Sequence, residues 1–420
     1  MILLIRNARI IDPRSPLHHR QQDILIEDGR ILRIGQLGSV DADQEVDIPG
    51  LHVSPGWIDI FAHACDPGFE YRETLETCAE AAAAGGYTHV MVMPNTQPVL
   101  QHKSQVEYVR DRPLSVPVSM LPIGAISRQA EGKELAEMYD MQASGAVAFS
   151  DGLKPVQSAG LLIKALQYVK AFDGVIIQVP DDQSIAPHGL MHEGVLSTQL
   201  GLAGKPAMAE EIMIARDIKL ARYTDSSLHF TGVSTAKSLE YIRRAKEAGL
   251  KITASVTPYH LWFTDEDLAD YDTNLKVNPP LRPAADRDAL RAALKDGTID
   301  AVASHHIPQD KDSKVCEFEY ARAGMLGLQT TPGLLGAIGL SPEQLVERLS
   351  LAPRSIFRLS PAVIAEDQPA DLTLFLPEET HIFTPAAIRS RSVNTPFAGV
   401  PLKGVVAGTI LGNRLQLNKR

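Results

Sequence analysis

The middle of the chain, from residue 53 to about residue 360, alternates short apolar segments with helical segments, and this alternation constrains the fold most strongly. Short apolar runs bounded by turn residues are typical of buried parallel strands, and longer segments with apolar residues every three or four positions are typical of covering helices. Strands are expected in residues 56–63, 88–95, 119–126, 145–151, 174–180, 227–234, 251–260 and 299–306. Helices are expected in residues 75–86, 133–144, 161–172, 206–223, 236–249 and 286–297. An α/β fold with eight strands and intervening helices predicts a (β/α)₈ barrel, also called a TIM barrel.

The two ends of the chain follow a different pattern, in which short β segments are separated by turns. Residues 1–52 hold three such segments, and residues 365–420 repeat the pattern with a tight turn at Gly412-Asn413. Alternation of apolar and polar residues beside glycine-containing turns is typical of β-hairpins. We therefore predict one small β-sandwich formed by both termini, 1–52 plus 365–420, and a barrel over 53–364 with its site at the C-terminal strand ends.

Composition excludes several classes of protein. The chain has 420 residues, 44% hydrophobic and 22% charged, with a net charge of −10, which are ordinary values for a globular protein. Because lysine and arginine form no run, no nucleic-acid partner is expected. The longest uncharged stretch, between Arg322 and Glu343, is rich in glycine, threonine and proline, so no membrane span is expected. Three cysteines without a paired spacing and a strand-like N-terminus favour a cytoplasmic location.

Polar residues stand at the ends of several predicted strands. Since the C-terminal ends of barrel strands meet at one mouth, these side chains are expected to gather there. Each of them alone could equally be a cap or a turn residue. Together they predict a site built from His63, Asn95, Asp151, Gln178, His260, His305 and His306.

Ten stretches in the same order carry a resemblance that covers nearly the whole chain: PGWIDI, DPGFEYRET, GGYTHVMVMPNTQPV, AFSDG, PAMAEEIMIARDI, VSTAKSLEYI, ITASVTPYHL, LKVNPPLR, LKDGTIDAVAS and NTPFAGVPLKG. In these stretches the sequence resembles the dihydroorotases of the multifunctional type, which belong to the cyclic amidohydrolases of the amidohydrolase superfamily. The resemblance implies a barrel with a β-sandwich made from both termini. It also implies hydrolysis of the ring amide of dihydroorotate, or its formation from carbamoyl-aspartate, with zinc, in pyrimidine biosynthesis.

The resemblance breaks at the metal ligands that it implies. Phe61 stands where the first strand should present the first histidine of a His-x-His pair, and His63 keeps the second. Asp151 keeps the ligand of the fourth strand. Gln178 and Gly232 stand where the fifth and sixth strands should present histidines. Of the implied metal ligands, only His63 and Asp151 remain.

Other positions of the implied site also differ. His305 replaces the aspartate of the eighth strand, which serves as ligand and general base, and Cys65 replaces the arginine that would bind the substrate carboxylate. Gly152 replaces the second aspartate of the fourth strand. In two later segments the replacements are Gln309, Arg322, Ala323 and Gln329. Asn95 and Asn278 match the substrate-binding asparagines, although both could instead cap loops of an inherited scaffold.

These replacements favour a non-catalytic member of the family. A catalytic zinc normally needs three protein ligands and an open position, and neither phenylalanine nor glycine can donate to a metal. The sequence therefore predicts no bound cofactor and a structural or regulatory role in pyrimidine biosynthesis. The expected partners are aspartate transcarbamoylase or an active dihydroorotase, and the expected assembly is a homodimer.

Two alternatives stay open. In the first, His63, Asp151 and His305 hold a single zinc ion in a remodelled cyclic amidohydrolase, and His305 replaces the family aspartate as the catalytic base. His306, His260 or Cys65 could assist such a site. In the second, the chain retains ordinary dihydroorotase activity. Metal content and turnover distinguish these alternatives from the non-catalytic interpretation.

Overall fold

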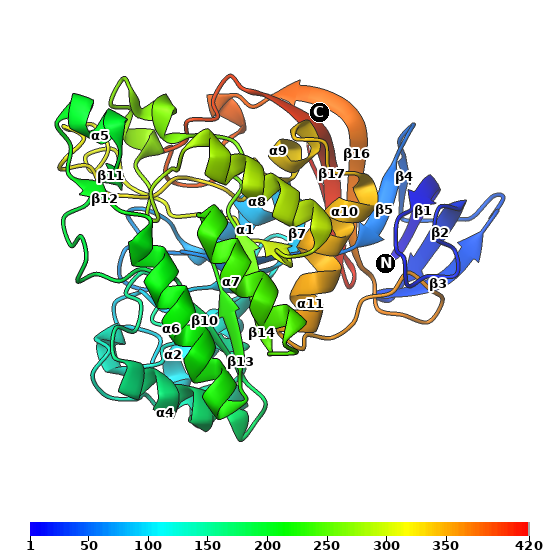
Figure 1. Ribbon diagram of the computed structural model, residues 1–420. Coiled ribbons are helices and arrows are strands. Elements are labelled where there is room, and N and C mark those ends of the chain that lie inside the picture. Colours follow the sequence, from blue (N-terminus) through cyan, green and yellow to red (C-terminus); the bar gives the residue numbers. More distant parts are fainter. Residues whose placement is uncertain (419–420) are drawn as a thin grey trace.

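The computed structural model describes residues 1–418, and in it both ends of the chain join one eight-stranded sheet (Figure 1). The hydrogen-bonded order is β18-β17-β16-β5-β1-β2-β3, and β4 pairs with β1. The central strand β5 is parallel to β1 and antiparallel to β16, so it connects the two halves of the sheet. The strands are β1 (Ile2–Ile10), β2 (Gln21–Glu27), β3 (Arg30–Gly35), β4 (Gln44–Asp47), β5 (His52–Pro55), β16 (Asp371–Ile382), β17 (Pro401–Leu411) and β18 (Arg414–Leu417).

A second sheet of eight parallel strands forms the barrel, in the order β15-β14-β13-β10-β9-β8-β7-β6. Its strands are β6 (Trp57–Ala62), β7 (Tyr87–Val92), β8 (Ser119–Gly124), β9 (Ala148–Phe149), β10 (Val175–Gln178), β13 (Ser227–Phe230), β14 (Ile252–Val256) and β15 (Ala301–Val302). The barrel closes between β6 and the segment after β15. There the backbone N–H of His63 donates to the carbonyl of His306 at 2.8 Å, and the buried Asp59 accepts from the backbone and the hydroxyl of Ser304. The predicted fold, a barrel with a β domain from both termini, is confirmed.

Helices cover the outside of the barrel, and α4, α6, α7 and α8 succeed one another around it (Figure 1). Each predicted helix is present: α1 (Leu75–Ala84), α3 (Met138–Ala143), α4 (Ala159–Lys170), α6 (Met208–Thr224), α7 (Ala236–Glu247) and α8 (Ala284–Asp296). The structure adds α2 (Lys103–Arg110), α5 (Val195–Leu200), α9 (Thr331–Ala337), α10 (Pro342–Val346) and α11 (Ala352–Ile356). These helices have at most eight residues, which is too short for a clear apolar period. No described helix is long and apolar enough to cross a lipid bilayer.

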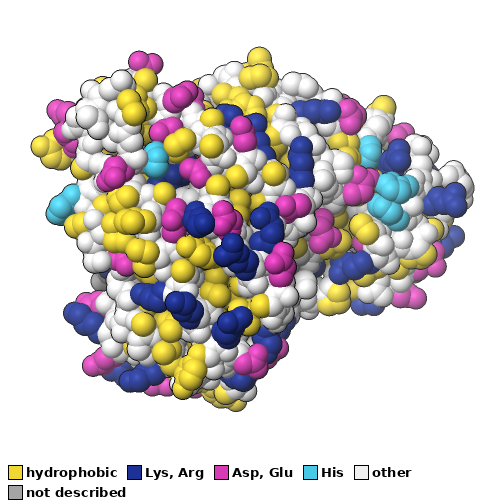
Figure 2. Space-filling view, in the orientation of Figure 1, with side chains coloured by type: hydrophobic (Ala, Val, Ile, Leu, Met, Phe, Trp, Pro, Cys, Tyr) yellow, Lys and Arg dark blue, Asp and Glu magenta, His cyan; other side chains and the backbone are white. Residues whose placement is uncertain are grey.

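Smaller elements complete the connections. Strands β11 (Met191–His192) and β12 (Gly204–Lys205) form a separate parallel pair on either side of α5. Short 3₁₀ turns lie at η1 (Arg128–Ala130), η2 (Asp265–Leu268), η3 (Thr273–Leu275) and η5 (Pro385–Ala387), and η4 (Glu347–Leu351) is a π turn. On the face shown in Figure 2, basic and acidic side chains are interspersed among apolar ones, as the scattered charges of the sequence lead us to expect.

The inside of the barrel is filled by apolar side chains up to the mouth. One buried cluster contains Ile58, Ile60, Met91, Ile123 and Ile177 on the strands themselves. The same cluster includes side chains beyond or at the last residues of the strands, namely Phe61, Met93, Val179 and Ile307. Apolar packing therefore extends to the level where the sequence places the site residues.

Candidate active site

His63 follows β6 directly, and both of its ring nitrogens are engaged within the protein. Its Nδ1 accepts a hydrogen bond from the backbone N–H of Cys65 at 2.9 Å, and its Nε2 lies 3.0 Å from the carbonyl oxygen of Asn95. Because Nδ1 is an acceptor here, Nε2 carries the proton and donates it to that carbonyl. Burial lowers the pKa of His63 to about 4, so the ring is neutral. A metal ion could bind His63 only by displacing one of these two hydrogen bonds.

Asp151, which follows β9, is also hydrogen-bonded within the protein. Its Oδ1 accepts from the backbone N–H groups of Ile126 and Ser127 at 2.9 Å each, and its Oδ2 accepts from the Ser127 hydroxyl at 2.5 Å. Burial raises the pKa of the Asp151 carboxyl to about 6 in spite of these hydrogen bonds. The carboxylate therefore caps the turn that follows β8.

His305 lies at the end of the eighth strand against Phe61, with ring centroids 4.8 Å apart. Its Nε2 is 2.8 Å from the hydroxyl oxygen of Thr231. Gly232 leaves the space that this ring needs, because a Cβ atom at Gly232 would lie 2.8 Å from Cε1 of His305. The replacements at these three ligand positions thus pack against one another.

A chain of hydrogen bonds runs from His305 into the barrel wall. The hydroxyl of Ser255 donates to Thr231 Oγ1 at 2.9 Å, so Ser255 accepts from Nε2 of His229 at 3.0 Å, and Nδ1 of His229 accepts from Thr253 at 2.9 Å. The Thr231 hydroxyl, which accepts from Ser255, is also hydrogen-bonded to Nε2 of His305. The second nitrogen of His305, Nδ1, has no hydrogen-bond partner among residues 1–418. His305 is therefore held through Nε2 alone.

The remaining polar residues of the predicted mouth are also bound within the protein. The side chain of Gln178 bridges the backbone of Val156 and the carboxylate of Asp217. His260 is bonded through Nδ1 to the Thr257 hydroxyl at 2.7 Å and through Nε2 to the carbonyl of Pro280 at 3.1 Å. Both side chains are buried and hydrogen-bonded within the protein, so they are structural in this conformation.

His306 and Cys65, which the sequence offered as assisting ligands, lie in similar surroundings. The Nδ1 of His306 accepts from the backbone N–H of Gly327 at 3.2 Å, and its Nε2 lies 3.3 Å from a carboxylate oxygen of Glu73. Burial raises the pKa of the Cys65 thiol well above its ordinary value, which disfavours the thiolate that a metal requires.

The two asparagines are engaged as well. The amide of Asn95 donates to the carbonyl of Asp151 at 3.0 Å and accepts from the backbone N–H of Leu153 at 3.0 Å, so it holds the loop after β9. Asn278 accepts from Lys205 at 3.0 Å and donates to Asp181 at 3.2 Å. Both asparagines therefore have the loop-holding contacts of the scaffold alternative.

The zinc that the family resemblance implies can be tested against these contacts. In residues 1–418, no group of three or more His, Cys, Asp or Glu side chains is placed so that it could hold a metal ion. The structure does not bring His63, Asp151 and His305 together as a ligand set, and Phe61, Gln178 and Gly232 supply no good donors between them. The residues present do not fit a catalytic zinc.

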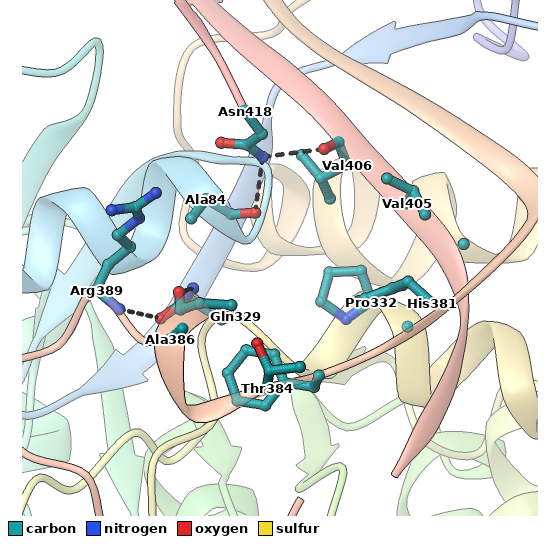
Figure 3. A pocket seen from close by; sticks show the side chains of 14 residues that line it. Ala84, Gln329, Pro332, His381, Thr384, Ala386, Arg389, Val405, Val406 and Asn418 are labelled. Atoms are coloured by element: carbon teal, nitrogen blue, oxygen red, sulfur yellow. Dashed lines mark hydrogen bonds between the residues drawn. The ribbon is translucent and has the colours of Figure 1, made fainter. Parts of the chain in front are cut away.

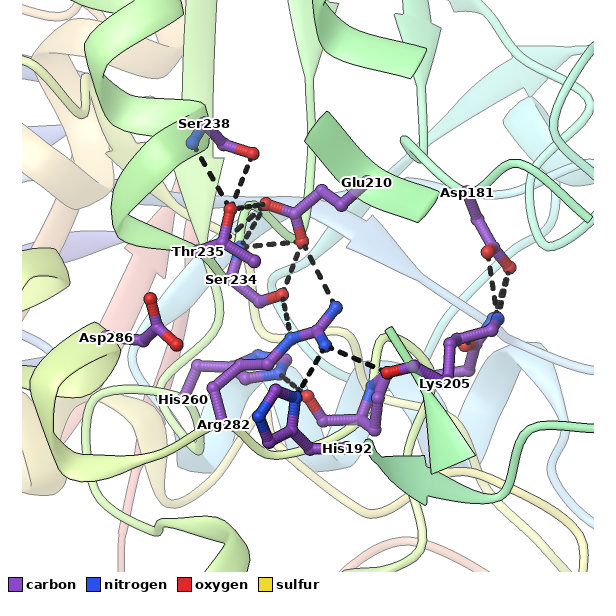
Figure 4. Close-up of polar contacts among 12 residues, drawn as sticks. Asp181, His192, Lys205, Glu210, Ser234, Thr235, Ser238, His260, Arg282 and Asp286 are labelled. Carbon is purple, nitrogen blue, oxygen red and sulfur yellow. Dashed lines mark hydrogen bonds and ion pairs between the residues drawn. The ribbon is translucent and has the colours of Figure 1, made fainter. Parts of the chain in front are cut away.

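Residues from three of the sequence stretches that resemble dihydroorotases make structural contacts with one another. The buried Glu210 of α6 accepts from the backbone N–H groups of Ser234 and Thr235, at the start of α7. Arg282 donates to the Ser234 hydroxyl at 3.0 Å and to Nδ1 of His192 at 3.1 Å, and it pairs with Glu210 at 3.9 Å (Figure 4). This network ties three distant loops together without any contribution from the altered ligand positions.

Gln329, another altered position, lines a cavity of about 360 Å³ beside β17 and α9 (Figure 3). Its amide donates to the carbonyl of Ala387 at 2.8 Å and accepts from the backbone N–H of Arg389 at 2.8 Å. Gln329 therefore fastens the segment after β16 to the barrel.

Comparison with known proteins places the chain among relatives with the same architecture. Residues 50–238 match a family model described as "Dihydro-orotase-like". A dihydroorotase of Pelotomaculum thermopropionicum is 43% identical over 100% of this chain and 99% of the relative, and one of Syntrophus aciditrophicus is 40% identical over 99% of each. The chain belongs to the dihydroorotase family. An L-hydantoinase (dihydropyrimidinase) from Arthrobacter aurescens has the same fold, with a TM-score of 0.86 and 24% identity over 100% of this chain and 97% of that one.

Several contacts of this dihydroorotase-like chain have no signal in the sequence. The ion pair of Lys205 with Asp181 joins β12 to the segment after β10, and the hydrogen bond between Thr231 and His305 spans 74 positions. The signal in the sequence is the set of polar residues at strand ends, which indicates that their side chains gather at the mouth. Whether those side chains face a ligand or one another depends on partners that pattern alone does not identify.

Proposed function

We propose that this member of the dihydroorotase family does not catalyse the dihydroorotase reaction, and that it serves as a structural or regulatory protein of pyrimidine biosynthesis. The observation that carries the proposal is that both retained ligands are hydrogen-bonded within the protein. Two of the metal ligands that the resemblance implies are present, His63 and Asp151. Their ring nitrogens and carboxylate oxygens form hydrogen bonds with backbone and hydroxyl groups of the same chain.

The chemistry of the reaction supports this proposal. Attack on a ring amide at neutral pH needs an activated water and a group that accepts its proton. Phe61 and Gly232 cannot ligate a metal that would activate water, and Nε2 of His305 is already hydrogen-bonded to Thr231. The substrate carboxylate also loses its charged partner, because Cys65 cannot make the paired hydrogen bonds of an arginine. The metal ligands, the general base and the group that binds the substrate carboxylate are thus all altered.

Aspartate transcarbamoylase is the proposed partner, with an active dihydroorotase as the other candidate, and the chain itself is proposed to be a cytoplasmic homodimer. The network of Glu210, Ser234 and Arg282 is buried and complete, which supports a role that depends on the folded surface.

A turnover assay tests the catalytic part of the proposal. The purified chain and the Pelotomaculum thermopropionicum relative are assayed side by side with dihydroorotate and with carbamoyl-aspartate, each with and without added zinc. We expect turnover only from the relative. Turnover by this chain at a comparable rate would show it to be an ordinary dihydroorotase, and slow turnover that depends on His305 would favour the remodelled site.

Size-exclusion chromatography tests the partner. The chain is mixed at micromolar concentration with the aspartate transcarbamoylase of the same organism, and we expect one complex that elutes before either protein alone. The active dihydroorotase of that organism, where one is present, serves as the comparison. Separate elution in both mixtures would contradict the structural role proposed here.

A further inference from the structure

The cavity of about 360 Å³ that Gln329 lines lies where α1 and α9 of the barrel meet β16 and β17 of the sheet formed by both termini (Figure 3). A cavity of this size is in the lower range of small-molecule sites, which runs from about 300 to 1,000 Å³. Its described lining includes none of the polar residues that the sequence places at the mouth, and it does not include Asn278. The cavity is therefore separate from the site of the family reaction.

One part of the lining is apolar. Pro332 of α9 is buried, and Phe383, which follows β16, is only 5% exposed. Val405 and Val406 of β17 are half-buried beside them. The ring of His381 also lines the cavity, and burial lowers its pKa below the ordinary value, so this ring adds a neutral surface. An apolar or aromatic group of a ligand could be buried against this part of the wall.

Arg389 supplies the positive charge of the lining. Its backbone N–H donates to the Gln329 amide at 2.8 Å, and that amide donates to the carbonyl of Ala387 at 2.8 Å, so the segment that carries Arg389 is fixed. In Figure 3 the side chain extends toward Ala84, at the end of α1. Glu80 lines an adjoining cavity that also includes Arg389. Within residues 1–418, however, the guanidinium forms no salt bridge with Glu80 or any other acidic group.

We propose that this cavity binds a small organic acid, whose carboxylate pairs with Arg389 and whose apolar body lies along Pro332 and Phe383. The guanidinium donates through a planar fork that matches the two oxygens of a carboxylate. An exposed charge pair alone contributes little to affinity, so burial of the apolar body has to supply the rest. The combination selects acids that carry an apolar group, and it does not depend on whether the altered mouth is catalytic.

Saturation-transfer difference NMR with the full chain tests this site. The probe is phenylacetate, and the comparison molecules are its neutral amide, phenylacetamide, and acetate, which lacks the apolar body. We expect saturable binding of phenylacetate with a dissociation constant of about 1 mM or lower. Each comparison molecule should bind about tenfold more weakly or worse. Absence of saturable phenylacetate binding, or equal affinities for the acid and the amide, would overturn the proposal.

Three variants locate the binding. Arg389→Met removes the guanidinium and should weaken phenylacetate binding by about tenfold or more. Gln329→Glu keeps an acceptor for the Arg389 backbone but adds a negative charge to the lining, so it should also weaken binding. Arg391→Met is the matched control, because Arg391 is an exposed arginine of the same segment that does not line the cavity.

Circular dichroism and thermal melting check that the variants fold. Arg389 is exposed and its side chain holds no other described residue, so Arg389→Met remains usable if Gln329→Glu fails to fold. Unaltered binding in Arg389→Met, or an equal loss in Arg391→Met, would place the acid elsewhere and contradict the proposal.

Discussion

Gly232 and His305 fit together at the mouth of the barrel: a Cβ atom on Gly232 would lie 2.8 Å from Cε1 of the His305 ring. Both residues stand at positions where the dihydroorotase resemblance implies a metal ligand. The ring of His305 occupies space that only glycine leaves open, and it also packs against Phe61 at 4.8 Å. The altered positions are therefore adapted to one another.

Gly232→Ala should lower the free energy of unfolding for two reasons. The backbone φ of 74° is strained for alanine, and the added Cβ atom would clash with the His305 ring. Gly201→Ala is the matched control, since Gly201 has φ 68° and a Cβ atom there would meet no other atom within 4 Å. We expect Gly232→Ala to cost about 1–3 kcal/mol more than Gly201→Ala in urea unfolding. Equal losses in the two variants would show that the His305 ring does not depend on Gly232.

Restoring the implied ligands together should create a zinc site. The combined variant carries Phe61→His, Gln178→His, Gly232→His and His305→Asp, which removes the ring that a side chain at residue 232 would meet. We expect this variant to bind zinc, measured by metal analysis after dialysis, because it supplies the donors that catalytic zinc requires. Gly232→His alone should bind none and should be less stable than wild type. A combined variant that folds yet takes up no zinc would show that more than these positions has changed.

Stability should fall as the pH is lowered from about 6.5 toward 4. Burial lowers the pKa of His229, His260 and His305 to about 3, against 6.5 as the ordinary value. Between these values the unfolded chain binds protons that the folded chain does not, so each histidine costs up to about 2 kcal/mol between pH 6.5 and pH 5. Asp59 and Asp151, with pKa values raised to about 6, act in the opposite direction between pH 3.8 and 6 and offset part of the loss.

Urea unfolding at several pH values between 8 and 4.5 measures this dependence. The variant His305→Gln removes one of the buried titrating rings, so its stability should change less with pH than that of the wild type. A wild-type profile that is flat, or that rises as the pH falls, would mean that these histidines are not buried in the neutral form.

The ion pair of Lys205 and Asp181 should be strongly coupled. Lys205→Met leaves the Asp181 carboxylate buried without its cation, and we expect a loss of about 3–5 kcal/mol in the free energy of unfolding. The double variant Lys205→Met with Asp181→Leu should recover much of this loss, because no buried charge is left unpaired. Additive losses in the double-mutant cycle would indicate that the two side chains do not interact in solution.

The alternation of strands and helices was enough to predict the barrel, because a parallel strand that is buried on both faces is a continuous apolar run, as residues 175–177 are. The same pattern could not show α2, whose eight residues bury only Val106 and Val109. At the termini, hairpin turns predicted the strands, but not that β5 would extend the terminal sheet to Pro55. Asn418 is the last residue described, so the predicted end of this region at residues 419–420 lies outside the described part of the chain.

The position of the site could be predicted from the sequence, but the hydrogen-bond partners of its side chains could not. Strand-end residues such as His63 and Asp151 lie at the mouth as the topology requires. Their partners are backbone N–H groups and hydroxyls of other loops, for example Ser127 with Asp151 and Thr231 with His305. Which of several polar groups a buried side chain meets depends on loop conformation, which periodicity does not encode.

Zinc content measures the central claim most directly, namely that the retained ligands are committed to internal hydrogen bonds. The protein is expressed with zinc in the medium, purified without chelator, and analysed by inductively coupled plasma mass spectrometry beside the Pelotomaculum thermopropionicum relative. We predict far less than one zinc per chain, unchanged in His63→Ala and His305→Ala. One zinc per chain that is lost in either variant would contradict the claim and establish a remodelled metal site.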